Sequence, residues 1–365
     1  MLIQVETLDD LAAGSVFLGT GGGGDPYLNT LIARRILAEH GPVELLPPAE
    51  LADDAFVVGI GGVGAPSAGL ELLPAARQCA HALRQFEAHV GRKVDALVAV
   101  EVGGANSLIP IVAAAVRGLP VVDGDGMGRA FPEAQMTTFS IGGIPSTPSV
   151  AVDYEGGSEL FLQAAALDFE RAIRQFALSH GGVVIATEHP MSGSQLKRTI
   201  VPGTMTFAIE LGRTLRQRSG RAERISPHLR EVFAGSIYGE FRHLHSGKIV
   251  DVSSRTVGGY DTGRVTIRSF DDAQALEIDI RNEFLVARRD GQLLASVPDL
   301  ITIVDYETAV PINAERLRYG QRVTVFGIGC PPYYRTERAL AAVGPRSFGF
   351  DFDYRPLEQL SEGVA

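Results

Sequence analysis

Over residues 1–155, short β-rich runs alternate with helical stretches, and each run ends at or beside glycine. Alternation of this kind is typical of a parallel sheet whose faces are covered by helices. The sequence therefore predicts an α/β N-terminal domain with a largely parallel sheet. The strands are expected at Ala55–Ile60 before Gly61-Gly62, at Val94–Glu101 before Gly103-Gly104, and at Leu119–Val122 before Asp123-Gly124.

Helices are expected between these strands, because apolar residues recur there with helical spacing. Asp25 is placed to act as N-cap of the first helix, with Pro26 in its first turn. A longer amphipathic helix is predicted over Ser158–Ser179, before the helix-terminating pair Gly181-Gly182. The helices expected between the strands are Tyr27–Glu39, Glu71–Val90 and Asn106–Arg117.

The remainder of the chain predicts a second, mostly antiparallel β domain, because short alternating runs separated by Gly, Asn or Asp follow one another there. A chain of 365 residues is too long for one ordinary core, so we expect two domains, residues 1–180 and 181–365. The second is predicted to hold one or two helices, one of them at Thr204–Arg218. Its tail, Pro345–Pro356, is expected to pack back on the first domain. The predicted strands are Lys248–Val252, Arg264–Ser269, Ala275–Arg281, Phe284–Arg288, Leu300–Asp305 and Gln321–Phe326.

Charge and cysteine content argue against several classes of function. A net charge of −10 is unfavourable for binding nucleic acid or an anionic membrane surface, which both select basic proteins. Acidic residues stand near the N-terminus, where a signal peptide would carry Lys or Arg, and no long apolar run occurs. We therefore expect neither a signal peptide nor a transmembrane helix. The two cysteines, Cys79 and Cys330, lie far apart, so neither a disulfide framework nor a zinc ribbon is expected. We therefore expect a cytoplasmic protein without nucleic-acid or membrane partners.

The densest glycine run, Gly19–Pro26, precedes the first predicted helix. Its backbone N–H groups are suited to binding a phosphate or carboxylate at a helix N-terminus. The run matches the G-x-G-x-x-G spacing, but no Walker lysine follows and the Asp25 carboxylate would repel an anion, so no nucleotide is expected. A tight turn capped by Asp25 is the structural alternative. The candidate substrate-binding residues of this run are Gly22, Gly23, Gly24 and Asp25.

A carboxylate and an amide flank the next glycine pair, at Glu101 and Asn106. Ligands of open α/β sheets bind beyond the carboxyl ends of the strands, where both side chains are predicted to lie. Glu101 is a candidate catalytic residue, because a carboxylate that ends an apolar strand must find a partner or water. Gly103, Gly104 and Asn106 are candidate substrate-binding residues, with a helix cap as the alternative role of Asn106.

The segment Asp123–Glu133 combines three acids and one arginine with glycines. Carboxylates in different surroundings can act as general acid and general base, so Asp123, Asp125 and Glu133 are candidate catalytic residues. Arg129 is a candidate clamp for a carbonyl or an anionic group of the substrate. The alternative is an Asx-rich turn that Arg129 holds together.

The segment Glu188–Arg198 brings a histidine, a lysine and an arginine together after a predicted strand. His189 is a candidate general acid or base, and Lys197 and Arg198 are candidate substrate-binding residues, with a structural histidine and solvated cations as the alternatives. His243 and His245 could either bind a metal or lie exposed on an edge strand, so a divalent metal is kept as an open alternative. No nucleophile elbow and no pyridoxal signature is present, which favours attack by water over covalent catalysis.

Several of these motifs together resemble the S-methyl-thiohydantoin desulfurase family over nearly the whole chain. The resemblance implies a two-domain fold and hydrolysis of an S-methylated thiohydantoin propionate to the hydantoin with loss of methanethiol. It implies a carboxylate that deprotonates water and an acid that protonates the departing thiolate or a ring nitrogen. Arg129, Lys197, Arg198 or the glycine-loop amides would anchor the propionate. The matching motifs are Gly21–Pro26, Glu101–Asn106, Asp123–Glu133, Pro298–Ile301 and Gly344–Gly349.

Members of this family are often encoded beside hydantoinase/oxoprolinase-type proteins, which leaves a second hypothesis open. The chain is then a non-catalytic partner subunit in a complex of that type. The expected partners are a small-molecule substrate and, as open alternatives, a second copy of the chain or a hydantoinase/oxoprolinase-type subunit.

Overall fold

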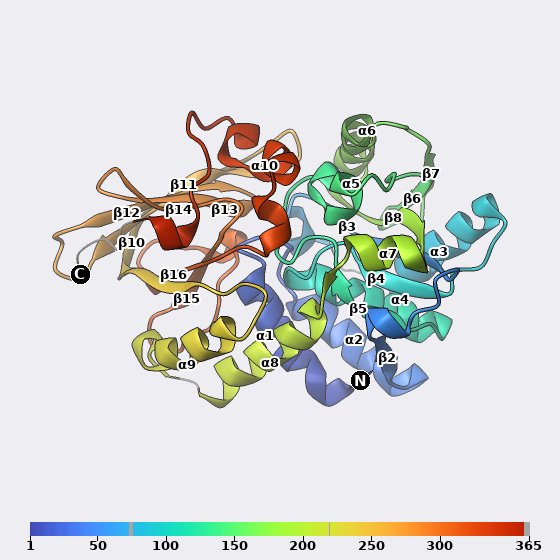
Figure 1. Cartoon of the computed structure of the whole chain (residues 1–365), viewed down its shortest axis with the longest axis horizontal. Coiled ribbons are helices and arrows are strands. Elements are labelled where there is room, and N and C mark those ends of the chain that lie inside the picture. The colour runs from blue at the N-terminus through green and yellow to red at the C-terminus, as the bar shows by residue number, and fades with distance from the viewer. Residues whose placement is uncertain (73–75, 219, 361–365) are drawn as a thin grey trace.

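Two β-sheets organise the computed structural model, which describes residues 1–72, 76–218 and 220–360. A nine-stranded sheet with helices lies on one side and a seven-stranded sheet on the other (Figure 1). The predicted fold class, an α/β part followed by an antiparallel β part, is confirmed. Within the described residues, none of the helices has the length and apolar character that a membrane span requires.

The first sheet has the order β1-β2-β5-β4-β3-β8-β6-β7, and β9 pairs with β5. Its central strands β2, β5, β4 and β3 are parallel, whereas β8, β6 and β7 extend it in antiparallel fashion. β8 and β9 follow residue 180 in the chain, so the first sheet continues beyond that residue. The strands are β1 Leu2–Ile3, β2 Val43–Leu46, β3 Phe56–Gly64, β4 Ala96–Ala99, β5 Val121–Asp125, β6 Ser149–Val152, β7 Ser158–Phe161, β8 Val183–Ser192 and β9 Val201–Pro202.

Helices cover both faces of the parallel strands, which are apolar on both sides as expected for buried parallel sheets. Leu97 and Ala99 of β4 share a core with α2, α3 and α4, whereas Ala96 and Val98 face α5 and α7. The α-helices are α1 Leu8–Leu18, α2 Tyr27–His40, α3 Ala76–Val90, α4 Ile109–Arg117, α5 Thr138–Ile141, α6 Ala166–Ser179, α7 Gly193–Thr199, α8 Thr204–Gln217, α9 Ala222–Ala234 and α10 Glu337–Val343. The 3-10 helices are η1 Val5–Thr7, η2 Pro48–Glu50, η3 Ala68–Leu70, η4 Gly104–Ser107, η5 Ala134–Met136, η6 Ala314–Arg316, η7 Pro332–Arg335, η8 Pro345–Phe348 and η9 Leu357–Gln359.

The prediction of one helix over Ser158–Ser179 is wrong in its first part. Ser158–Phe161 forms β7, which pairs with β6, and the helix begins only at Ala166. The Asp153 carboxylate accepts hydrogen bonds from the N–H groups of the turn that follows it and so closes the β6–β7 hairpin. Among the other predicted helices, Thr204–Arg218 is confirmed, and the helix predicted at Asn106–Arg117 begins only at Ile109 because η4 precedes α4. The helix predicted at Glu71–Val90 is confirmed over Ala76–Val90, and residues 73–75 of that prediction lie outside the described residues.

The second sheet is wholly antiparallel, in the order β14-β13-β12-β11-β10-β16-β15. The six strands predicted in this region all fall within it. Their bounds are β10 Phe241–Val257, β11 Tyr260–Ser269, β12 Ala275–Arg281, β13 Glu283–Arg289, β14 Gln292–Ser296, β15 Leu300–Asp305 and β16 Arg322–Ile328.

The two sheets share a continuous core. Phe17 of α1 stacks on Phe326 of β16 at 6.3 Å between ring centroids and on Phe233 of α9 at 5.8 Å. Thr302 of β15 also donates a 2.6 Å hydrogen bond to the carbonyl of Phe17. α1 therefore connects the α/β sheet to the β-rich sheet.

The tail packs on the β-rich half. The hydroxyl of Tyr354 donates a 2.7 Å hydrogen bond to Asp299, and the N–H of Leu357 donates to the other oxygen of that carboxylate at 2.8 Å. The guanidinium of Arg288 lies over the rings of Phe350 and Phe352. These contacts of the tail all reach strands or loops of the second sheet.

Candidate functional site

A cavity of about 300 Å³ opens at the carboxyl ends of β3 and β4, which is where the sequence predicts a binding site. It is lined by the end of β3 and the residues after β4, by the glycine loop, by residues of β8 and by residues at the start of β13. Of the candidate site residues, those lining the cavity are Gly23, Gly24, Asp25, Glu101, Asn106 and Glu133. The candidates that do not line it are Gly22, Gly103, Gly104, Asp123, Asp125, Arg129, His189, Lys197 and Arg198.

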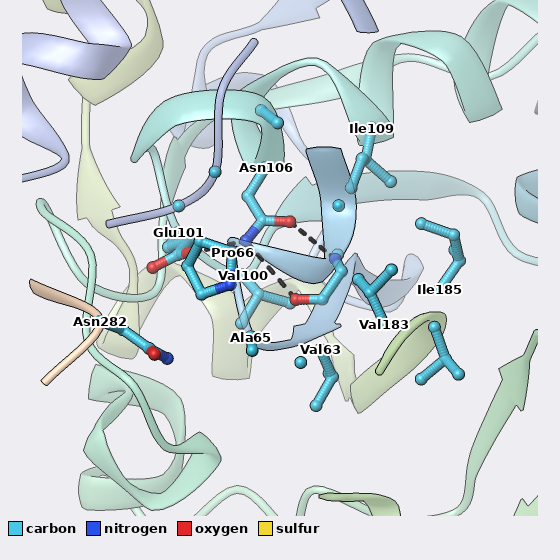
Figure 2. A pocket seen from close by; sticks show the side chains of 18 of the residues that line it. Val63, Ala65, Pro66, Val100, Glu101, Asn106, Ile109, Val183, Ile185 and Asn282 are labelled. Carbon is cyan, nitrogen blue, oxygen red and sulfur yellow. Dashed lines mark hydrogen bonds between the residues drawn. The ribbon is translucent and has the colours of Figure 1, made fainter. Parts of the chain in front are cut away.

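Glu101 is an acid of the cavity whose two carboxylate oxygens both accept hydrogen bonds (Figure 2). One of its carboxylate oxygens accepts a hydrogen bond from the Asn106 amide, and the other accepts from the N–H of Phe131 at 3.2 Å. The Asn106 carbonyl in turn accepts a 2.6 Å hydrogen bond from the N–H of Gly62. Asn106 therefore acts as a clamp between β3 and Glu101, where the sequence left a helix cap as the alternative.

Burial and the charge of Asp125 together raise the pKa of Glu101 to about 8, although the hydrogen bonds from Asn106 and Phe131 oppose the rise. A carboxyl group with a pKa near 8 exchanges protons easily at neutral pH. Glu101 therefore has the properties of a general acid or base.

A second buried acid, Glu188, reaches the cavity from the middle of β8. Its Oε2 atom has no hydrogen-bond partner among the described residues. Burial raises its pKa to about 8, and the charges of Glu170 and Glu101 contribute to the rise. Sequence patterns selected this segment for its histidine and its cations, and did not select Glu188. A carboxylate in an apolar strand, the pattern that identified Glu101, could also have identified Glu188.

His189 lies next to Glu188 with its side chain fully buried. Its Nε2 atom is 2.9 Å from the hydroxyl of Ser140 and 3.2 Å from that of Ser146. Its Nδ1 atom lies 3.7 Å from Oε2 of Glu188. Burial lowers the pKa of His189 to about 3, so the imidazole is neutral at physiological pH. His189 therefore lies behind the acid of the cavity, outside its lining.

The β-rich half contributes a third buried acid, Glu283, at the start of β13. Burial, followed by the charge of Glu101, raises its pKa well above the ordinary value. A Cβ on Gly22 would lie 2.2 Å from the Glu283 carboxylate, so a larger residue there would have to displace this side chain. Sequence patterns did not identify Glu283, because its proximity to Glu101 arises only when the two sheets pack together.

Arg174 and two more glutamates form a paired network on one wall. The guanidinium of Arg174 donates to Glu170 at 2.7 Å and to the carbonyls of Pro132 at 2.7 Å and Gly259 at 3.1 Å. Glu133 accepts hydrogen bonds from Arg281 and Gln135. This wall therefore has a fixed geometry and its charges are matched.

The glycine loop is held mainly through its carbonyl groups. The carbonyls of Gly23 and Gly24 accept from the N–H groups of Asn106 at 3.3 Å and Ala105 at 2.9 Å. Asp25 accepts a 2.8 Å hydrogen bond from the N–H of Tyr27 at the start of α2 and forms an ion pair with Arg316 at 2.6 Å. Asp25 thus supports the turn, and Pro26 occupies the N-cap position itself.

The aspartates of the segment Asp123–Glu133 serve the backbone. Asp125 is fully buried and accepts hydrogen bonds from the N–H groups of Val102 at 2.8 Å and Gly128 at 2.8 Å, and from the hydroxyl of Thr204 at 2.8 Å. Burial raises its pKa to about 7. This corresponds to the alternative of an Asx-rich turn, since the N–H groups of the glycine-rich turn need a buried acceptor.

Arg129 is a buried structural link between the two halves. Its guanidinium donates to the carbonyls of Pro298 and Asp299, each at 2.9 Å, and to the hydroxyl of Thr20 at 2.7 Å. The side chain has no exposed surface. Its donors thus serve carbonyls and a hydroxyl of the protein itself, and the predicted clamp for substrate is absent from the cavity lining.

The remaining candidates also lie outside the cavity lining. Lys197 on α7 pairs with Asp53 at 2.8 Å, and Arg198 on the same helix is exposed. Gly103 and Gly104 allow the loop after β4 to pack closely on neighbouring backbone, since a Cβ on Gly104 would lie 2.2 Å from the carbonyl oxygen of Gly24. In the described part of the chain, no three His, Cys, Asp or Glu side chains form a cluster that could hold a metal ion.

Replacing Asp123 by alanine is expected to lower the free energy of unfolding by about 0.5–2 kcal/mol, measured by urea denaturation. The Asp123 carboxylate, on β5, accepts hydrogen bonds from the N–H of Thr206 at 3.1 Å and from the Thr206 hydroxyl at 2.6 Å. It therefore caps the first turn of α8. Asp123→Asn keeps one acceptor oxygen and should lose less stability. Equal stability of Asp123→Ala and the unchanged protein would contradict this capping role.

Known proteins resemble the chain in sequence and in fold. The family model described as "S-Me-THD-like, N-terminal domain" matches residues 6–163, and the model "S-Me-THD-like, C-terminal domain" matches residues 164–357. A crystal structure of a protein from Chromobacterium violaceum superposes with a TM-score of 0.80 at 22% identity, over 98% of this chain and 100% of that one. At this identity the likeness demonstrates a shared fold. No curated protein gives a significant match. The two family models together extend from residue 6 to residue 357, and the chain belongs to the S-Me-THD-like family, that of the S-methyl-thiohydantoin desulfurases.

Proposed function

We propose that this protein is a hydrolase that adds water to the sulfur-bearing carbon of an S-methylated thiohydantoin ring and releases methanethiol. The observation that supports the proposal most directly is the pair of buried acids, Glu101 and Glu188, which line the same cavity and each have a pKa raised to about 8. Hydrolysis of this kind needs one group that accepts a proton and one that donates it. The name of the family supplies the type of ring.

Glu101 is proposed as the base. Its two oxygens accept hydrogen bonds from Asn106 and Phe131, and these donors fix the orientation of the carboxylate and favour its ionised form. A carboxylate whose pKa is near 8 is also a stronger base than an ordinary one. It takes a proton from water as the water oxygen bonds to the ring carbon.

Glu188 is proposed as the acid, because a carboxyl group with a pKa of about 8 is mostly protonated at neutral pH. It protonates the ring nitrogen of the amidine-like group while water adds to the ring carbon. When the adduct collapses, the hydroxyl proton returns to Glu188, the C–S bond breaks, and methanethiolate takes the proton held by Glu101. Both carboxyl groups regain their starting states, and the products are the hydantoin and methanethiol.

His189 is proposed as a positioning residue for Glu188. The imidazole is neutral, is held by the hydroxyls of Ser140 and Ser146, and presents Nδ1 to the Glu188 carboxyl group at 3.7 Å. It thereby limits the orientations that the acid can adopt. The propionate that the family resemblance implies on the ring would meet the glycine loop and Arg316, which Asp25 already pairs.

The test is incubation of the purified protein with an S-methyl-thiohydantoin in water enriched in ¹⁸O, while free thiol and the ring product are measured. We expect thiol release together with a hydantoin that carries one ¹⁸O atom at the former sulfur-bearing carbon. A folded protein that releases no thiol alone, yet activates an added hydantoinase/oxoprolinase-type subunit, would favour the partner-subunit hypothesis instead.

The pH dependence of kcat/KM provides a separate prediction. Glu101 must be ionised and Glu188 protonated at the start of the reaction, and the pKa of each lies at about 8. The rate should therefore rise with pH up to about 8 and fall beyond it, with apparent pKa values that belong to the coupled pair. In Glu188→Gln the alkaline decline should disappear from the residual activity. A profile that is flat from pH 6 to pH 9 would contradict these roles.

A further inference from the structure

We infer that the substituent on the ring is uncharged and apolar, an aliphatic or aromatic side chain, where the family resemblance implies a propionate. The inference rests on the proposed function, because it assumes that the ring binds beside Glu101 and Glu188. It depends on two features of the same cavity. One is an apolar wall, and the other is that the cations of the cavity already have partners while its acids are buried together.

The apolar wall consists of Val63, Ile109, Val183 and Ile185, which come from β3, α4 and β8. Figure 2 shows Ile109, Val183 and Ile185 together on one side of the cavity, while Glu101 and Asn282 lie on the other. A ring held at Glu101 would therefore extend its substituent along this wall. Burying an aliphatic side chain there removes apolar surface from water on both partners.

The cations that line the described part of the cavity are Arg174 and Arg316. Arg174 already pairs with Glu170 and donates to two backbone carbonyls, so its charge is matched and each guanidinium nitrogen has an acceptor. Arg316 pairs at 2.6 Å with Asp25 of the glycine loop. A propionate would therefore have to compete with Asp25 for Arg316 or remain without a cationic partner.

The acids of the cavity argue against a substrate anion as well. Glu101, Glu188 and Glu283 are buried together, and the charge of Glu101 already raises the pKa of both other groups. One more carboxylate would face these groups in a poorly solvated site, which is unfavourable without a matching cation.

The first experiment compares kcat/KM for S-methyl-thiohydantoins that carry an isobutyl, a benzyl or a propionate group at the same ring carbon. We expect the isobutyl or benzyl compound to exceed the propionate compound by about 10-fold or more, the discrimination typical of apolar pockets. Equal or faster turnover of the propionate compound would overturn the inference and leave the proposed reaction intact.

Binding of the corresponding hydantoin products, measured by calorimetry, separates the inference from the proposed function. Tighter binding of the isobutyl or benzyl hydantoin supports the apolar preference even if no compound is hydrolysed, in which case only the proposed reaction fails. Tighter binding of the hydantoin propionate would overturn the inference whatever the turnover.

A variant tests the wall itself. Val183→Arg introduces a cation at a partly buried position of the apolar wall and should shift the preference towards the propionate compound by about 10-fold or more. Val310→Arg is the matched control, because Val310 is 58% exposed and lies outside the cavity lining, and it should leave the preference unchanged. If Val183→Arg does not fold, Val63→Lys tests the same wall. An unchanged preference in a folded variant of the wall would overturn the inference.

Discussion

Glu101→Gln is expected to lower kcat/KM for thiol release by about 100- to 10,000-fold, the range typical of losing a general base. Glutamine has nearly the shape of glutamate but cannot accept the proton of the attacking water. The folded structure should survive, because the glutamine oxygen can still accept from Asn106 or Phe131. Losing one of these hydrogen bonds lowers the free energy of unfolding by about 1 kcal/mol. Circular dichroism and urea denaturation check the fold.

Glu159→Gln is the matched control, because Glu159 is an exposed glutamate of β7 and does not line the cavity. It should keep full activity. If the rate of Glu101→Gln stayed within about threefold of the unchanged protein, Glu101 would not be the base, and Glu188 or Glu283 would take its place among the candidates.

The same variant should change how stability depends on pH. The pKa of Glu101 is about 8 in the folded state, above that of an ordinary carboxyl group near 4.5. The folded protein therefore binds more protons than the unfolded chain between these values, so stability falls as pH rises from about 4.5 to about 8. Glutamine does not ionise, and Glu101→Gln should lose less stability across this range than the unchanged protein.

Arg129→Ala is expected to lower the free energy of unfolding by about 3–5 kcal/mol, the loss typical of breaking a buried charged network. The substitution leaves the carbonyls of Pro298 and Asp299 and the hydroxyl of Thr20 without their donor. It also removes the guanidinium that lies 4.5 Å from the centre of the Phe131 ring. The two halves should then separate more easily in urea.

Arg198→Ala provides the control, since Arg198 is an exposed arginine on α7. Its effect on urea denaturation should stay within about 0.5 kcal/mol, as for most surface substitutions. A loss below about 1 kcal/mol for Arg129→Ala would mean that water replaces the guanidinium and that the link between the halves lies elsewhere.

Sequence patterns predicted the frame of the molecule because strands and helices repeat with different periods, and because glycines mark the strand ends of an α/β sheet. Glu101 and Asn106 were found for the same reason, since both follow a recognisable apolar strand. The helix predicted over Ser158–Ser179 failed because a two-strand hairpin can contain apolar residues at helical spacing.

The rest of the site was harder to predict, because a carboxylate beside glycine can face either a ligand or the N–H groups of its own turn. Asp125 faces its turn and Glu101 faces the cavity, although both lie at the carboxyl end of a strand of the same sheet. Glu188 comes near Glu101 through the pairing of β8 with β3, and Glu283 does so only through the packing of the two sheets. Pairings of this kind leave no local pattern in a single sequence.

The glycine loop has a consequence for how such proteins can change in evolution. Gly21 accepts a hydrogen bond from Ala314 through its carbonyl, and Gly22 leaves room for Glu283, so the loop is completed by the second half of the chain. Glu101 lies in the region matched by one family model and Glu188 in the region matched by the other. A gene that lost either half would encode only one of the two acids that we propose as acid and base. Recombination between relatives would join cavity walls of different origin, and under the proposed function this would change ring specificity in a single step.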